Sequence, residues 1–394
     1  WDPLALIDLH VTDGAKFEHD VAVQVEPVHA GDAALREVGR ALRDGVIAQL
    51  SAQGSLPLPY YPSFDVDDDP SSGITDSVPP PRFSTGYFQL RNRFAMLVET
   101  HSWKDYPTRV RITHNTILAV LEQIAANGKA WRQQALEADA RAGHFAGQAV
   151  PLTYKASDKT RSVDFRGYAY TREPSEISGA LMTRYDESTP QIWKMPLRDE
   201  VLPDLSLAAP AAGYLVPAEH AAWLGEKLKL HGVSYRILAQ ALPATELQVF
   251  RAETAKRSAT SFEGHQTLSV TGQWATERRE LAAGALFVPI NQAKARLVMA
   301  LLEPQAPDSF AAWGWFNNQF EQKEYMEAYV AEELARAQLV ADPGLSELFR
   351  KRLADDPAFA KNPRARLEFF ARRHSNWDER LNLYPVLRTD VAPR

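Results

Sequence analysis

The sequence predicts an α/β protein, in which an open mixed sheet is followed by a β-rich domain and then by a mainly helical C-terminal region. Three observations support this fold class. In the first 145 residues, apolar runs of strand length alternate with stretches of helical spacing. After residue 150, short runs rich in β-branched and aromatic residues are separated by turns. Helical spacing returns from residue 291. The expected domains are therefore 1–145, 150–290 and 291–394.

The amino-terminal region has clear strand and helix signals. Residues 4–10 (LALIDLH) are predicted to form a short, fully buried strand, and residues 94–102 (FAMLVETHS) to form the next one. A helix is predicted over 32–54, with Asp32 as its N-cap and Gly54 as its stop signal. Residues 109–128 read as a second helix ending near Gly128, and a further helix follows it. Residues 55–81 form a long loop rich in Pro, Ser and Asp.

Composition excludes several classes of protein. The 394 residues are 45% hydrophobic and 24% charged, with a net charge of −6 and no block of Lys or Arg, so a nucleic-acid partner is not expected. No apolar stretch is long enough for a membrane span. The absence of cysteine excludes disulfides, thiolate metal sites and a cysteine nucleophile. The chain opens at Trp1 just before a core strand, which indicates a fragment or a processed chain.

Two polar residues interrupt the apolar strands near their carboxyl ends. His10 ends the first strand, and Glu99 lies within the apolar run MLVETHSW of the second. Ligands bind beyond the carboxyl ends of the strands in open α/β sheets, and a carboxylate in such a strand is costly to bury unless it is paired or functional. A His ligand and a Glu general base are components of zinc-dependent hydrolysis. A satisfied core or loop histidine is the alternative interpretation of His10.

These two motifs resemble a known family. LIDLHVTDG and NRFAMLVETHSWKDYPTRV, preceded by PRFSTGYFQLRNR, look like the second half of an M14-type zinc metallocarboxypeptidase domain, in particular its bacterial members. The resemblance covers about residues 1–130. It implies a sheet of carboxypeptidase type that is partial at its N-terminus, with Zn²⁺ as cofactor, His10 as the later zinc ligand and Glu99 as the catalytic base.

The chain departs from the family pattern in one respect. The family holds zinc with an early His-x-x-Glu pair as well, and none of the ten histidines here is followed by Glu at that spacing. The family's Arg for the substrate carboxylate also precedes the later His. We expect a missing N-terminal segment or a separate fragment to complete the site, and the chain alone to be inactive or to bind zinc weakly.

Other residues are candidates for substrate binding or ion binding. Tyr87 is a candidate hydrogen-bond donor to the substrate, and Arg91 and Arg93 could hold a substrate carboxylate or pair with acidic groups of the fold. The acidic loop DVDDDP (65–70) could hold calcium, although a solvated loop is the favoured interpretation. The aromatic run WGWF (313–316) suits either a sugar-stacking platform or core packing, and packing is favoured.

The sequence thus predicts a zinc-dependent hydrolase that cleaves a peptide or amide bond, with a peptide or an acylated amino acid as substrate. Carboxypeptidase and deacylase activities both remain open. The alternative is a non-catalytic peptide- or glycan-binding protein on a degenerate carboxypeptidase fold. A periplasmic or secreted location is expected, and a cytoplasmic one is not excluded.

Overall fold

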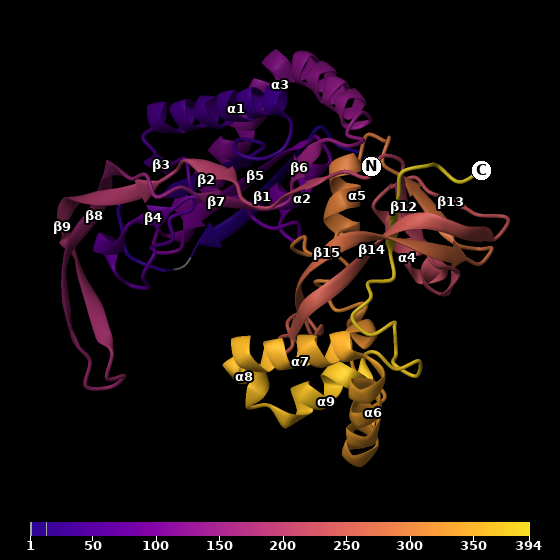
Figure 1. The fold of residues 1–394 in the computed structure, drawn as a ribbon. Helices are drawn as coiled ribbons and strands as arrows, with labels where there is room; N and C mark the ends of the chain where they lie inside the picture. The colour runs from indigo at the N-terminus through magenta and orange to yellow at the C-terminus, as the bar shows by residue number, and fades with distance from the viewer. Residues whose placement is uncertain (1, 13) are drawn as a thin grey trace.

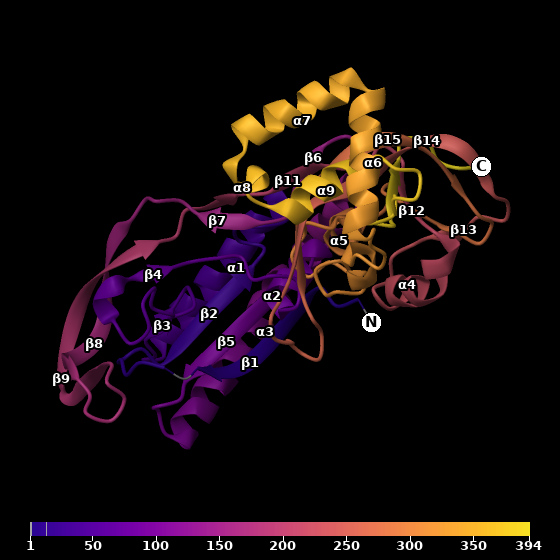
Figure 2. The same ribbon diagram turned by 60° about the horizontal axis from the view of Figure 1, so that its bottom comes forward.

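The structure is a computed structural model that describes residues 2–12 and 14–394, and it is mixed α/β with several sheets. The first sheet has four strands in the order β1-β5-β2-β3. These strands are β1 (Ala5–Thr12), β2 (Val21–Glu26), β3 (Pro57–Leu58) and β5 (Phe94–His101). β5 runs parallel to β1 and antiparallel to β2. Figures 1 and 2 show helices α1 (Ala33–Ala52) and α3 (Tyr106–Ala142) on one face of this sheet.

The helix-covered face of the first sheet is apolar because of strand alternation. Phe94, Met96 and Val98 project from β5 into a core shared with Val23 and with Leu42 of α1. Asp32 caps α1, as predicted, by accepting a hydrogen bond from the Ala34 amide at 3.0 Å. The opposite face carries Asp8 and His10 of β1 together with Glu99 and His101 of β5.

Two local predictions are wrong. β1 is an edge strand rather than a fully buried one, and Leu9 and Val11 are 44% and 48% exposed. The two helices expected after residue 109 form the single helix α3, which passes through Gly128 without a break. A glycine inside a helix costs only about 1 kcal/mol, and the long apolar stripe of α3 against α1 and the sheet compensates for it.

Much of the β-rich stretch belongs to two separate sheets. The long hairpin β8–β9 (Arg161–Pro174 and Leu181–Arg198) joins β4 (Ile74–Thr75) in a three-stranded sheet. Phe165 and Trp193 of this hairpin pack with Phe17 and Ala22 of the amino-terminal region. The distal part of the hairpin projects away from the body of the molecule (Figure 1). Two small pairs, β10-β7 and β11-β6, consist of β6 (Ala149–Pro151), β7 (Tyr154–Ala156), β10 (Val201–Pro203) and β11 (Ser206–Ala208).

The largest sheet has six antiparallel strands in the order β13-β16-β12-β17-β14-β15. Its strands are β12 (Gly213–Val216), β13 (Arg236–Ile237), β14 (Leu242–Arg257), β15 (Leu268–Leu281), β16 (Leu286–Pro289) and β17 (Leu387–Thr389). Two helices, α4 (Ala218–Leu230) and α5 (Ala295–Leu302), pack against it. Because β17 lies between β12 and β14, a segment near the C-terminal end of the chain forms an inner strand of this sheet.

A buried carboxylate fastens that returning strand. Glu303 follows α5 and is fully buried. It accepts hydrogen bonds from Arg388 Nε of β17 at 2.9 Å, from Trp274 Nε1 of β15 at 3.2 Å and from the Tyr214 hydroxyl of β12. The carboxylate therefore joins three strands that lie far apart in the sequence.

The remaining helices form a separate C-terminal group (Figure 1). They are α6 (Ala328–Ala341), α7 (Pro343–Asp355), α8 (Pro357–Ala360) and α9 (Pro363–Ala371). Asp342, Asp356 and Asn362 cap α7, α8 and α9, and each precedes a proline at the first helical position. A short helix α2 (Ser84–Leu90) and two 3₁₀ turns, η1 (Pro70–Ser72) and η2 (Asn317–Phe320), complete the described elements.

Candidate functional site

The pairing of β1 with β5 brings His10 and Glu99 together. The two residues are register partners on adjacent parallel strands, so their Cα atoms are about 5 Å apart and their side chains project from the same face of the sheet. The Thr100 hydroxyl donates to the His10 carbonyl at 3.3 Å, which fixes the two strands at this point. The structure therefore places His10 and Glu99 next to each other on adjacent strands, near the carboxyl ends of both.

The two side chains differ in their exposure to solvent. The His10 side chain is 53% exposed, whereas Glu99 is only 7% exposed. β1 is the edge strand, and so the histidine stands at the rim of the sheet while the glutamate is enclosed between β1 and β2. A buried carboxylate beside an accessible imidazole is an arrangement in which one group can meet a ligand and the other can handle a proton.

A carboxylate that sequence reasoning missed supports His10. Asp8 Oδ1 lies 2.8 Å from His10 Nε2. The two residues are two positions apart on one strand, so both project from the same face. This contact orients the ring and favours the tautomer with hydrogen on Nε2, which leaves the Nδ1 lone pair as the metal-binding position. The alternation D-x-H within a predicted strand is the sequence signal that could have identified Asp8.

The donor set for a metal is incomplete in the part of the chain that the structure describes. No group of three or more His, Asp or Glu side chains there is arranged to hold a metal ion. His10, with its carboxylate partner, fits one position of a zinc site. The expectation that another polypeptide segment supplies further zinc ligands stays a prediction.

His101 belongs to the core beneath this site. It is fully buried, and its ring lies 4.1 Å from the ring of Phe17. Burial lowers the pKa of His101 to about 4, and the nearby Lys104 charge acts in the same direction. The imidazole is therefore neutral at physiological pH and behaves as an aromatic packing residue.

The three candidate substrate-binding residues lie elsewhere. Arg91 and Arg93 precede β5, whereas Glu99 lies near its other end, six residues and about 20 Å further along the strand from Arg93. Arg91 pairs with Asp2 at 2.9 Å, and Arg93 pairs with Asp2 at 2.7 Å and with Asp139 of α3 at 3.0 Å. Arg91 and Arg93 thus hold the start of the chain to the sheet, and Arg93 also holds α3 to it.

Tyr87 also lies away from His10 and Glu99. It belongs to α2, and its hydroxyl shares a hydrogen bond of 2.8 Å with His231 Nδ1, at the end of α4. Burial raises the pKa of Tyr87 and lowers that of His231, so both groups are neutral. Tyr87 therefore connects the first sheet region to the six-stranded sheet region.

The acidic loop is held by protein groups. Asp65 pairs with Arg198 at 2.7 Å, Asp69 pairs with Arg172 at 2.5 Å, and Asp68 accepts a hydrogen bond from the Thr183 amide at 2.9 Å. All three partners lie on β8 or β9. Through Asp65, Asp68 and Asp69 the loop thus fastens the projecting hairpin.

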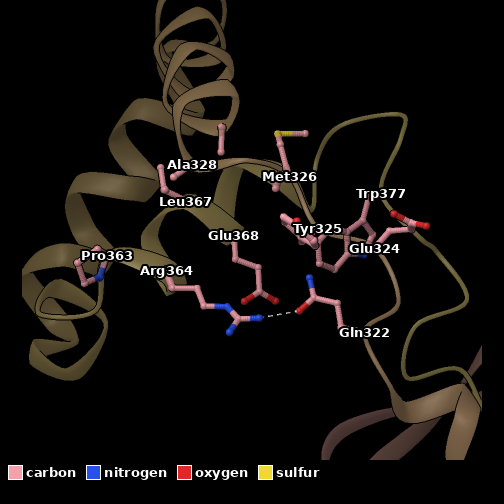
Figure 3. Close-up of a pocket in the computed structure, with 12 residues that line it drawn as sticks. Gln322, Glu324, Tyr325, Met326, Ala328, Pro363, Arg364, Leu367, Glu368 and Trp377 are labelled. Atoms are coloured by element: carbon pink, nitrogen blue, oxygen red, sulfur yellow. Dashed lines mark hydrogen bonds between the residues drawn. The ribbon is translucent and has the colours of Figure 1, made fainter.

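A hollow of about 540 Å³ lies among the C-terminal helices. Figure 3 shows Tyr325, Met326 and Trp377 on one side of it and Arg364 and Glu368 of α9 on the other. Arg364 donates to Gln322 Oε1 at 3.0 Å across the opening. Neither His10 nor Glu99 contributes to it.

The comparisons with known proteins identify no relative. No family model matches the chain, and neither a curated protein nor a solved structure matches it significantly. Among the described helices, none combines the length and the apolar character that a membrane crossing requires.

Proposed function

We propose that this chain carries part of the catalytic centre of a zinc-dependent hydrolase that cleaves a peptide or amide bond, similar to the M14 metallocarboxypeptidases. The observation that supports the proposal is the pairing of His10 with Glu99 on adjacent parallel strands, with Asp8 behind the histidine. The sequence motifs around both residues point to the same family.

In this proposal each residue has one role. His10 would hold zinc through Nδ1, with Asp8 keeping its ring in that orientation. Zinc held there would supply Lewis-acid chemistry toward the scissile carbonyl and a nearby water. Glu99 accepts a proton from the attacking water at its carboxylate and passes it to the nitrogen of the leaving amine. The low exposure of Glu99 keeps bulk water from the carboxylate, so its electrostatic interactions with the reacting groups are stronger.

A Glu99→Gln variant of the full-length gene product tests the proposal. Glutamine keeps the size of the side chain but cannot accept the proton, so zinc content is expected to stay the same while hydrolysis of a blocked dipeptide falls by at least 10²-fold. Glu122→Gln, at an exposed residue of α3 whose carboxylate contacts Gln49 of α1, is the control and should keep full activity. Parental activity in Glu99→Gln would exclude the base assignment.

A second function is favoured by the incomplete ligand set. This alternative is a non-catalytic protein on a degenerate carboxypeptidase fold, in which the β-rich part of the chain recognises a peptide or glycan. Zinc content separates the two functions. The hydrolase retains about one zinc ion per chain after dialysis against metal-free buffer and loses it in His10→Ala, whereas the binding protein retains none.

A further inference from the structure

A second concave site lies between elements that the proposed hydrolase does not use. This cleft, of about 470 Å³, is formed by α2, α4, the turn between β14 and β15, and the loop after α5. We call it the tryptophan cleft, because Trp313 and Trp315 line it together with Phe310 and Tyr87. Its volume falls in the range typical of small-molecule sites, about 300–1,000 Å³.

The backbone around the cleft is unusual at three positions. Glu263, Asp308 and Gly314 all have positive φ angles, of 49°, 60° and 77°. Such angles are unfavourable for residues other than glycine and concentrate at functional sites. Two of the five non-glycine residues with positive φ in the described part of the chain therefore line this one cleft.

The first of these positions is the tip of the β14–β15 hairpin. Phe262 and His265 exchange two backbone hydrogen bonds of 2.8 Å, so Glu263 and Gly264 are the central residues of a two-residue turn with positive φ at both. Asn, Asp and Gly are the residues that favour the first position of such a turn. A glutamate there is conformationally unfavourable, and it places a carboxylate in the wall of the cleft.

Gly314 sets the positions of the two tryptophans. A Cβ atom at this residue would lie 2.3 Å from the Gln266 carbonyl oxygen, so no larger residue fits without a backbone shift. Trp315 stacks on Trp223 with ring centroids 5.1 Å apart, yet remains 41% exposed. Trp313 contacts His265, with ring centroids at 5.3 Å. The run WGWF therefore does more than fill the core: it presents indole surface to a cleft.

The charges in the cleft balance. Arg82 is held by Asp308 at 2.8 Å, and Lys227 and Glu263 add one charge of each sign. An anionic ligand would meet two carboxylates and a cationic ligand two basic groups. A purely apolar ligand would remove water from these charged groups without replacing its hydrogen bonds. A neutral ligand with many hydroxyl groups and one apolar face can hydrogen-bond to the charged groups of the cleft and pack on its indoles.

We propose that the tryptophan cleft binds a neutral saccharide. The C–H face of a pyranose ring can pack on the indoles, and its hydroxyls can donate to Glu263 and Asp308 and accept from Lys227 and Arg82. The competing ligand is an aromatic side chain of a peptide, which would use the indoles but leave the charged rim unsatisfied. The proposal is independent of the hydrolase function, since His10 and Glu99 do not line this cleft.

Isothermal titration calorimetry of the full chain with cellotriose, maltotriose and triacetylchitotriose tests the proposal. At least one of these sugars should bind, and Trp315→Ala should weaken that binding roughly tenfold. Glu263→Gln, at an exposed turn that does not endanger folding, should also weaken it. Trp377→Ala removes a tryptophan from the separate hollow of Figure 3 and should leave binding unchanged.

Three outcomes would overturn the proposal. The first is that none of the three sugars binds. The second is that binding survives in Trp315→Ala and Glu263→Gln, both shown to be folded by circular dichroism. The third is that N-acetyl-tryptophanamide binds with the same dependence on Trp315 while the sugars do not, which would assign the cleft to peptides.

Discussion

His19 makes the fold sensitive to acid through two backbone contacts. Its Nδ1 lies 2.9 Å from the Leu56 carbonyl oxygen, and its Nε2 accepts a hydrogen bond from the Arg166 amide at 3.2 Å. This geometry requires the neutral ring with hydrogen on Nδ1. Protonation would place a second N–H directly against the Arg166 amide. We therefore expect a His19→Gln variant to lose less stability in acid than the wild type.

The size of the effect follows from the pKa. Burial lowers the pKa of His19 from 6.5 to about 4, and the charges of Arg166 and Lys104 act in the same direction. The unfolded state then takes up the proton at higher pH than the folded state, so stability falls as the pH drops from about 6.5 to about 4. A shift of this size corresponds to about 3 kcal/mol. His101 has the same direction of shift and adds to the loss.

Urea unfolding measured by circular dichroism at several pH values between 4 and 7 tests this expectation. The wild type should lose about 3 kcal/mol more than His19→Gln over that range. His114→Gln is the matched control, because His114 is an exposed residue of α3, and its profile should follow the wild type. Parallel profiles for the wild type and His19→Gln would refute the reasoning.

Two further predictions concern stability. Glu303→Ala leaves the buried Arg388 charge without its carboxylate and should lower the free energy of unfolding by about 3–5 kcal/mol in urea titrations; a loss below about 1 kcal/mol would contradict the role given to Glu303. Gly39→Ala should cost about 3 kcal/mol because its Cβ would lie 1.9 Å from the Pro27 carbonyl oxygen of the β2–α1 loop. Gly128→Ala, whose Cβ meets only an Ile124 methyl at 3.1 Å, should change stability by no more than about 1 kcal/mol. Equal losses in the two glycine variants would show that contact with Pro27 does not decide the outcome.

Features encoded by local signals could be predicted from the sequence. The N-cap at Asp32 and the apolar spacing of residues 32–54 define α1 within two residues at each end. The apolar run 94–102 defines β5 within one residue. The continuity of α3 could not be predicted, since it depends on packing against α1 and the sheet, which offsets the local cost of Gly128.

Features that depend on distant partners were beyond local reasoning. Residues 387–389 carry no distinctive strand signal. β17 is held between β12 and β14, where Arg388 donates a hydrogen bond to the distant Glu303. β1 reads as a buried strand, but the order β1-β5-β2-β3 leaves it at the edge. For the candidate site, the proximity of His10 and Glu99 could be inferred from strand ends alone. The pairing of Arg91 and Arg93 with Asp2 and Asp139 required the three-dimensional structure.

The most direct test of the hydrolase proposal is a crystal structure of the zinc-loaded full-length gene product, with anomalous diffraction recorded at the zinc edge. We expect one strong peak about 2.0–2.1 Å from His10 Nδ1, on the face of the sheet that carries Glu99, with Asp8 still bonded to Nε2. A zinc peak at residues remote from β1, or no peak in protein that hydrolyses its substrate, would contradict the assignment.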